Sequence, residues 1–217
     1  MTNNKKARGI LVLALVFGVT AFGFSFDIKS FPSPIQKGSI LISGGFGLGI
    51  LQPEYFNSSI LLGGTVAVDY ALPINFALTV GGEAGFYVAK LESTADSPVD
   101  VSLAEIPIAL RVAWHPNWEI RNLDTYIVVK AGYGIGFWLG DTITEGIKKP
   151  HGIIVGSSVG VRYFFTPGFG AFLEGGFEGH YLKFKDEYEW GGTLFSTTHT
   201  AYATKFLTLG VTLKAGR

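Results

Sequence analysis

The ionisable residues that could do chemistry in this chain recur at alternate positions, on the same side of their segments as glycine and other small residues. Five are carboxylates and three are cations: Asp69, Glu83, Glu105, Glu174, Glu178, Arg111, Lys130 and Arg162. Charges withdrawn from water are stable only when they are paired or hydrogen-bonded. We therefore expect a buried network of ion pairs that fixes register and blocks flow, and we consider an ion path as the alternative.

Spacing predicts which of these charges meet. Folding the chain about its TPG turn brings Arg162 onto the diagonal from Glu174, within reach of a salt bridge. Folding it about the connection HPNWEIRNLD brings Lys130 beside Arg111. Two adjacent cations need a carboxylate from a neighbouring segment, and Glu83 is the nearest candidate.

The ion-path alternative depends on Glu83, Glu105 and Glu178, which strand counting places at a similar height. The sequence offers them no cationic partner at that height other than His180. If they remain unpaired, the three carboxylates form an acidic vestibule that selects cations.

Catalysis and metal binding are not predicted. His151, His180 and His199 are scattered, and Ser196, although close to His199, has no orienting carboxylate at a suitable spacing. With 0 Cys there is no disulfide, thiolate metal site or cysteine nucleophile. The glycine-rich stretch at 44–49 contains no Lys, which argues against a phosphate loop. We expect no cofactor and no enzymatic activity.

The elements that must position these charges are strands, because residue character alternates with a period of two along most of the chain. Between residues 76 and 88, bulky apolar side chains alternate with small or polar ones. Eight such segments are predicted, at 38–51, 59–72, 75–90, 100–114, 125–139, 152–165, 170–184 and 202–214. Eight strands of this length can close into a barrel.

The composition of the two faces decides which one points inward. The face that carries the charges is otherwise mostly Gly, Ala, Ser and Thr, which suits the narrow lumen of an eight-stranded barrel. The bulky face would overfill that lumen and, in water, would form a large aggregating patch. The predicted fold class is therefore all-β, an eight-stranded antiparallel up-and-down transmembrane barrel whose apolar face contacts lipid.

Connections alternate between short and long, as in bacterial outer-membrane barrels, with both termini on the short-turn, periplasmic rim. The long loops are predicted at 52–58, 91–99, 141–151 and 185–201. The last contains Tyr188, Trp190 and Phe195, which we regard as the best candidates for a surface contact.

Aromatic residues sort into two bands, as expected at the two membrane interfaces. One band comprises Tyr70, Phe76, Trp114, Tyr126, Tyr163 and Phe165, and the other comprises Phe86, Phe137, Trp138, Tyr181 and Phe184.

The N-terminus has the layout of a secretory signal, and the composition suits one domain. Lys5, Lys6 and Arg8 precede a short apolar run and then small residues. We predict a signal peptide at 1–25, cleaved after residue 23 or 25, and a barrel at 26–217. The 217 residues include 30 Gly and carry a formal net charge of +0, so no basic surface recruits nucleic acid.

With these features in view, the chain resembles the small eight-stranded outer-membrane proteins, the group that includes OmpW, OmpX and the membrane part of OmpA. The stretch LAEIPIALRVAW at 103–114 is similar to a strand common in such barrels. One departure is the ending FLTLGVTLKAGR, because members of the group usually end in an aromatic residue that the barrel assembly machinery reads.

The resemblance implies a monomer in the bacterial outer membrane, with lipid and the assembly machinery as partners. It also implies a small channel or carrier for small molecules, hydrophobic ones among them. The alternative is a non-conducting structural barrel that displays its loops for adhesion or host contact.

Overall fold

The computed structural model describes residues 34–53, 57–74, 77–92, 100–116, 122–140, 148–190 and 193–216. The predicted signal peptide lies outside these residues and stays a prediction. None of the described segments forms a helix that is long and apolar enough to cross a membrane.

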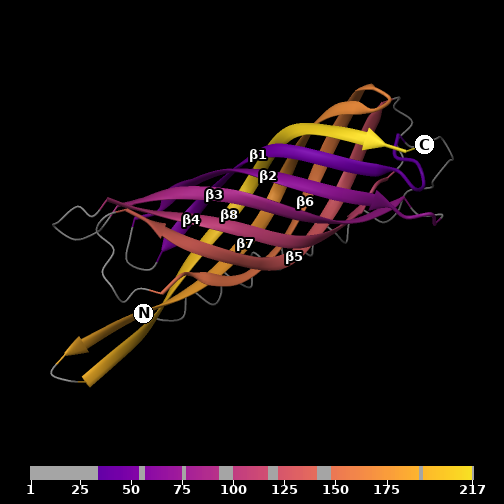
Figure 1. Ribbon diagram of the computed structural model, residues 1–217. Helices are drawn as coiled ribbons and strands as arrows, with labels where there is room; N and C mark the ends of the chain where they lie inside the picture. Colours follow the sequence, from indigo (N-terminus) through magenta and orange to yellow (C-terminus); the bar gives the residue numbers. More distant parts are fainter. Residues whose placement is uncertain are drawn as a thin grey trace, which may run out of the picture. The chain divides into compact units, whose positions relative to one another are not determined.

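Eight antiparallel strands follow one another around a closed barrel, and β1 pairs with β8 to complete the ring (Figure 1). The strands are β1 (Ile40–Pro53), β2 (Ser59–Ala71), β3 (Leu78–Glu92), β4 (Asp100–Trp114), β5 (Leu123–Leu139), β6 (His151–Thr166), β7 (Phe169–Trp190) and β8 (Thr193–Ala215). The predicted fold class is confirmed, and the predicted bounds are close for every strand except β7 and β8.

Burial alternates along the strands in the predicted sense. In β2, Leu61 and Ala67 are buried inside the barrel, whereas Ile60 and Val66 point outward and are 62% and 56% exposed. Leu110 in β4 is 75% exposed. The bulky apolar face therefore forms the outer surface, and the small and charged face lines the lumen.

The two ends of the barrel differ in their connections and in the apolar groups that close the lumen. We call the end that holds residue 216 and the β2–β3, β4–β5 and β6–β7 connections the C-terminal rim, and the other end the hairpin rim. The lumen toward the hairpin rim is filled by an apolar layer of Leu51, Leu61, Tyr87, Ala89, Leu91, Leu103, Leu182, Phe184, Ala201 and Ala203. A smaller group closes the C-terminal rim and comprises Ile35, Leu41, Ala71 and Phe164.

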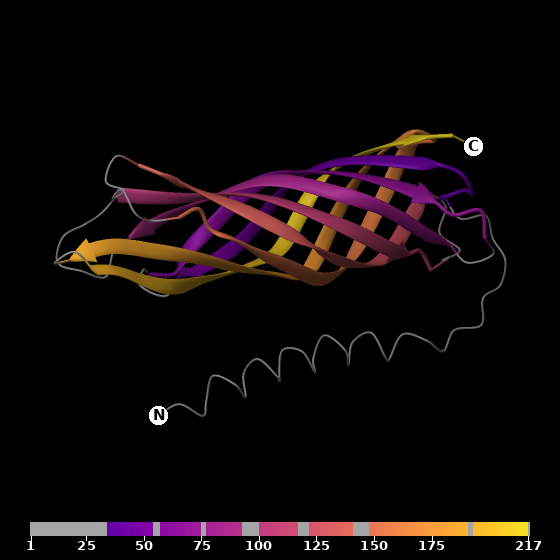
Figure 2. The same ribbon diagram turned by 60° about the horizontal axis from the view of Figure 1, so that its bottom comes forward.

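The predicted loop at 185–201 is wrong, because β7 and β8 extend through most of it. β6 pairs with β7 as far as Lys183, and β1 pairs with β8 as far as Ala201. Beyond these points, residues 184–190 and 193–199 pair with each other as a two-stranded ribbon, which we call the terminal ribbon. The ribbon extends past the rest of the hairpin rim (Figures 1 and 2).

The candidate contact residues Tyr188, Trp190 and Phe195 belong to the strands of this ribbon, where Tyr188 lies opposite Phe195. Their side chains lie outside the described part of the structure. The central residues of the other three predicted loops, 54–56, 93–99 and 141–147, also lie outside it.

Three of the residues assigned to the aromatic bands are not on the outer surface. Tyr126 and Phe184 are buried in the lumen and Trp138 packs against the apolar layer there, because each occupies an inward position in the alternation of its strand. Tyr70 and Phe165 are exposed near the C-terminal rim, and Phe86 is exposed on β3. Phe76 lies outside the described residues.

Candidate functional site

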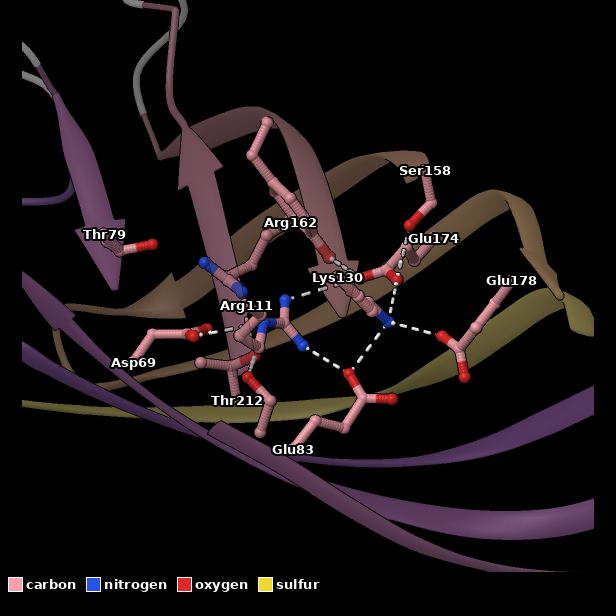
Figure 3. Close-up of polar contacts among 12 residues, drawn as sticks. Asp69, Thr79, Glu83, Arg111, Lys130, Ser158, Arg162, Glu174, Glu178 and Thr212 are labelled. Atoms are coloured by element: carbon pink, nitrogen blue, oxygen red, sulfur yellow. Dashed lines mark hydrogen bonds and ion pairs between the residues drawn. The ribbon is translucent and has the colours of Figure 1, made fainter. Parts of the chain in front are cut away.

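The centre of the lumen is occupied by Lys130 of β5, whose ammonium bonds three carboxylates (Figure 3). Its Nζ lies 2.7 Å from Glu174, 2.8 Å from Glu83 and 3.2 Å from Glu178. A lysine ammonium has three donors, so each of its hydrogens has an anionic acceptor. These carboxylates come from β3 and β7, and Lys130 therefore ties opposite walls of the barrel together.

Arg111 of β4 lies directly opposite Lys130, as predicted. Its guanidinium lies 2.8 Å from Glu83, 3.1 Å from Asp69 and 3.5 Å from Glu174. The predicted role of Glu83 as the carboxylate shared by both cations is confirmed. Gly81 separates the strands of Asp69 and Arg111, and a Cβ there would collide with Asp69, so glycine is required for the two charges to meet.

Lys205 of β8 is a fourth buried cation that the sequence did not reveal. Its Nζ lies 2.9 Å from Glu83 and 2.8 Å from Glu178. Strict alternation counted back from the exposed Leu209 puts Lys205 on the lipid face. A β-bulge at Phe206 shifts the alternation by one residue, because Leu207 pairs with Leu48 while Lys205 pairs with Gly49.

The predicted acidic vestibule is wrong, because its three carboxylates are paired. Glu83 and Glu178 bond lysines, and Glu178 also bonds His180 Nε2 at 3.0 Å. Glu105 bonds His180 Nδ1 at 2.7 Å. The suggestion that His180 is a partner is confirmed for Glu105 and Glu178, and Lys205 supplies the cation that the sequence reasoning lacked.

The predicted bond between Arg162 and Glu174 is also not formed. Arg162 bonds Asp124 at 2.9 Å. Asp124 stands directly opposite Arg162 across β5 and β6, and directly opposed residues are closer than diagonal ones. The predicted strand began at residue 125, which left Asp124 out of the count.

Asp124 belongs to a second polar group nearer the C-terminal rim. His115 Nδ1 lies 2.8 Å from Asp124, and His115 Nε2 lies 3.1 Å from the hydroxyl of Thr79. This hydroxyl–imidazole–carboxylate series has the order of a catalytic triad, and the sequence reasoning missed it. Thr79, His115 and Asp124 are 0%, 1% and 1% exposed, so no substrate reaches the hydroxyl in this structure.

Tyr126 joins the two polar groups. Its hydroxyl donates to Glu174 at 3.2 Å, and the Arg162 guanidinium lies 4.8 Å from the centre of its ring. The ring lies against Gly160, where a Cβ would overlap it. Ser158 also donates to Glu174, at 2.7 Å. All eight charged residues that were predicted to face the lumen are therefore buried. Seven of them are linked to one another through these contacts.

The eighth, Glu105, is linked to Glu178 through His180. The network as a whole carries nearly balanced charge. The buried ionisable side chains in the described part of the barrel are Asp69, Glu83, Glu105, Asp124, Glu174, Glu178, Arg111, Lys130, Arg162, Lys205, His115 and His180. Six are carboxylates and four are Lys or Arg. Protonation of both histidines would make the lumen neutral.

The network leaves little space along the axis. Two cavities beside Glu174 each have a volume of about 10 Å³, which is room for about one water molecule. The first is lined by Glu83, Arg111, Lys130 and Arg162 among others. Together with the apolar layer, these side chains fill the lumen between the two rims.

Several outer-membrane proteins of known structure have the same architecture. OprG from Pseudomonas aeruginosa aligns with a TM-score of 0.57 and 10% identity, over 86% of this chain and 100% of that chain. A major outer membrane protein from Thermus thermophilus aligns with a TM-score of 0.53 and 12% identity, over 82% of this chain and 99% of that chain.

Neisserial surface protein A aligns with a TM-score of 0.50 and 14% identity, over 82% of this chain and 99% of that chain. The chain has the fold of a small outer-membrane β-barrel. The predicted resemblance to these barrels is confirmed for the fold. No protein-family model matches the sequence, and no curated protein matches it either.

Proposed function

We propose that this protein is a bacterial outer-membrane barrel that does not conduct, and that it presents its hairpin rim and terminal ribbon as a contact surface outside the cell. The belt of exposed apolar side chains supports a membrane location, because a surface of this size is stable only against lipid. The likeness of the fold to outer-membrane proteins supports the same location.

The observation that carries the non-conducting role is the ion-pair network across the lumen. Lys130 and Lys205 each bond carboxylates from more than one position, and Glu83 is shared by three cations. Passage of a solute would require these charges to separate in a medium of low polarity, which is costly. The network therefore acts as a plug that also fixes the register of the strands.

The display role is supported by the terminal ribbon. Beyond Lys183 and Ala201, its two strands no longer pair with β6 or β1. The strand pairing that closes the barrel therefore ends below the ribbon, where Phe184, in the apolar layer, and the Lys185 carbonyl, which accepts from the Lys148 amide, still contact the rest of the barrel. With the ribbon outside the cell, the two ends of the described barrel, residues 34 and 216, lie on the periplasmic side, as in other barrels with an even number of strands.

Recording from planar bilayers tests the proposal. The full chain, refolded and checked for a heat-dependent shift in gel mobility, is expected to give no discrete conductance steps. The double variant Glu83→Ala/Lys130→Ala removes the centre of the network but leaves the apolar layer and the apolar group at the C-terminal rim, so it is expected to stay silent as well if it passes the same mobility check. Discrete steps from the unmodified protein would contradict the proposal.

A second candidate, a carrier for small hydrophobic molecules, is favoured by the apolar layer beneath the hairpin rim. Trp138 packs against this layer, and its ring lies 5.0 Å from that of Phe184. A brominated alkane that enters the layer would quench the fluorescence of Trp138. Saturable quenching that is lost in Trp138→Phe would favour the carrier, whereas no such component is expected of the plugged barrel.

A further inference from the structure

The outer surface of the hairpin rim carries a group of basic side chains that the proposed function does not use. Lys183 and Lys185 are exposed on the outward face of β7, and Lys149 is exposed on the connection between β5 and β6. We call Lys149, Lys183 and Lys185 the basic cluster. We propose that the basic cluster binds the phosphate of an anionic lipid in the outer leaflet, an inference that rests on the proposed function.

Backbone contacts hold the two parts of the basic cluster side by side. His151 stands directly opposite Lys183 across β6 and β7. The amide of Lys148 donates to the carbonyl of Lys185 at 2.8 Å, and His151 Nδ1 donates to the carbonyl of Lys149 at 3.2 Å. The segment 148–151 is therefore fixed alongside residues 183–185.

Two cations of the cluster rest on aromatic rings, which orient them at the edge of the apolar belt. Lys149 Nζ lies 5.2 Å from the centre of the Phe137 ring, and Lys183 Nζ lies 5.3 Å from that of Tyr181. These lysines combine an apolar stem that covers the ring with a charged head at the level of lipid headgroups.

Below the basic cluster, the outer surface is suited to acyl chains. Ile153 and Val155 of β6 are 56% and 57% exposed. Tyr181 packs on Tyr202 of β8, with ring centres 5.1 Å apart. A phosphorylated lipid could therefore place its phosphate against the lysines and its chains along these residues. Free phosphate would use only the upper half of this surface.

In the described part of the structure, the wall of the barrel separates the carboxylates from the basic cluster. Every carboxylate whose side chain is described is buried in the lumen: Asp69, Glu83, Glu105, Asp124, Glu174 and Glu178. The outward lysines therefore face lipid and solvent rather than a described carboxylate. Each lysine near a membrane surface strengthens the binding of an anionic lipid by about fivefold.

Electron paramagnetic resonance with spin-labelled lipids tests the inference. The full chain is reconstituted in phosphatidylcholine vesicles that contain trace spin-labelled phosphatidic acid or, in a parallel sample, spin-labelled phosphatidylcholine. We expect a higher immobilised fraction for phosphatidic acid. Lys183→Gln is expected to reduce the relative association constant about fivefold, and Lys149→Gln/Lys183→Gln/Lys185→Gln is expected to remove the preference.

The matched control is Lys90→Gln, which neutralises an exposed lysine at the hairpin end of β3. It should leave the preference within about twofold of the unmodified protein. Equal preferences in Lys183→Gln and the unmodified protein would overturn the inference, even if the triple variant does not fold. Loss of the preference on adding an equal concentration of inorganic phosphate, but not of chloride, would also overturn it, because the site would then recognise free phosphate.

Failure of the inference can be told apart from failure of the proposed function. If the unmodified chain does not insert, its gel mobility is independent of heating and the outer-membrane location fails. If it inserts but does not prefer phosphatidic acid, only the lipid site fails.

Discussion

At the scale of single residues, Lys130 has the most contacts with carboxylates of any cation in the network, together with Arg111. The variant Lys130→Met keeps most of the side-chain volume and leaves three carboxylates without their shared cation. Breaking a buried ion pair in this way costs about 3–5 kcal/mol. We expect a loss of this size in the free energy of unfolding, measured by urea titration in phospholipid vesicles.

The control for this measurement is Lys90→Met, which removes an exposed charge from the outer surface. A change of no more than about 0.5 kcal/mol is expected there. If both variants lose the same small amount, the network does not stabilise the barrel.

The positions of the carboxylates around His180 require both of its ring nitrogens to be protonated. Both of its ring nitrogens lie within hydrogen-bond distance of a carboxylate, at 2.7 Å from Glu105 and 3.0 Å from Glu178. Ionised carboxylates only accept hydrogen bonds, so both nitrogens must donate and the ring must be an imidazolium. We expect the side-chain ¹⁵N shifts of His180 to report two protonated nitrogens at pH 7. A neutral tautomer would mean that one of the two carboxyl groups holds the proton.

At the scale of elements, the terminal ribbon and the β8 bulge can each be removed without changing which side chains face the lumen. Replacing residues 186–197 by a two-residue Asn-Gly turn joins Lys185 to Thr198, which face each other in the ribbon. The shortened protein is expected to fold with the same heat-dependent mobility and the same unfolding midpoint, because barrel closure ends at Lys183 and Ala201.

Deletion of Phe206 instead removes the residue that forms the bulge opposite β1. Strict alternation from the outward Leu207 then keeps Lys205 facing the lumen, so its bonds to Glu83 and Glu178 are retained. We expect this one-residue deletion to keep the heat-dependent mobility, as excision of the ribbon does. Loss of that mobility would mean that the bulge itself is needed to close the barrel.

The terminal ribbon and the β8 bulge are also two features of the fold that the sequence did not predict. A period of two and the length of the turns were sufficient for the closed barrel, for the lumen-facing side and for the pairing of Lys130 with Arg111. Lys205 was missed because a bulge breaks the period locally without a signal in the sequence. The terminal ribbon was missed because its polar residues resemble a loop, although Gly191-Gly192 is a dipeptide that favours hairpins.

At the scale of the whole molecule, charge and apolar surface are separated by the wall of the barrel. The described carboxylates and the four buried cations lie inside, and the large apolar side chains cover the outside. This is the reverse of a soluble protein, in which charges solvate the surface. The arrangement is stable only if hydrocarbon surrounds the belt, so the cost of an outward charge should depend on its depth in the membrane.

Leu110 and Leu139 allow this dependence to be measured. Leu110 is 75% exposed and follows Ala109, which pairs with Glu83 at the level of the central network, whereas Leu139 is 46% exposed at the hairpin end of β5. Leu110→Arg is expected to lower the free energy of unfolding in vesicles by about 2–4 kcal/mol, and Leu139→Arg by about 0–1 kcal/mol. Corresponding Ala variants separate the loss of apolar area from the added charge. Equal losses of unfolding free energy at the two positions would mean that the belt is not surrounded by a bilayer, because the cost of an outward arginine in water does not depend on its position along the barrel axis.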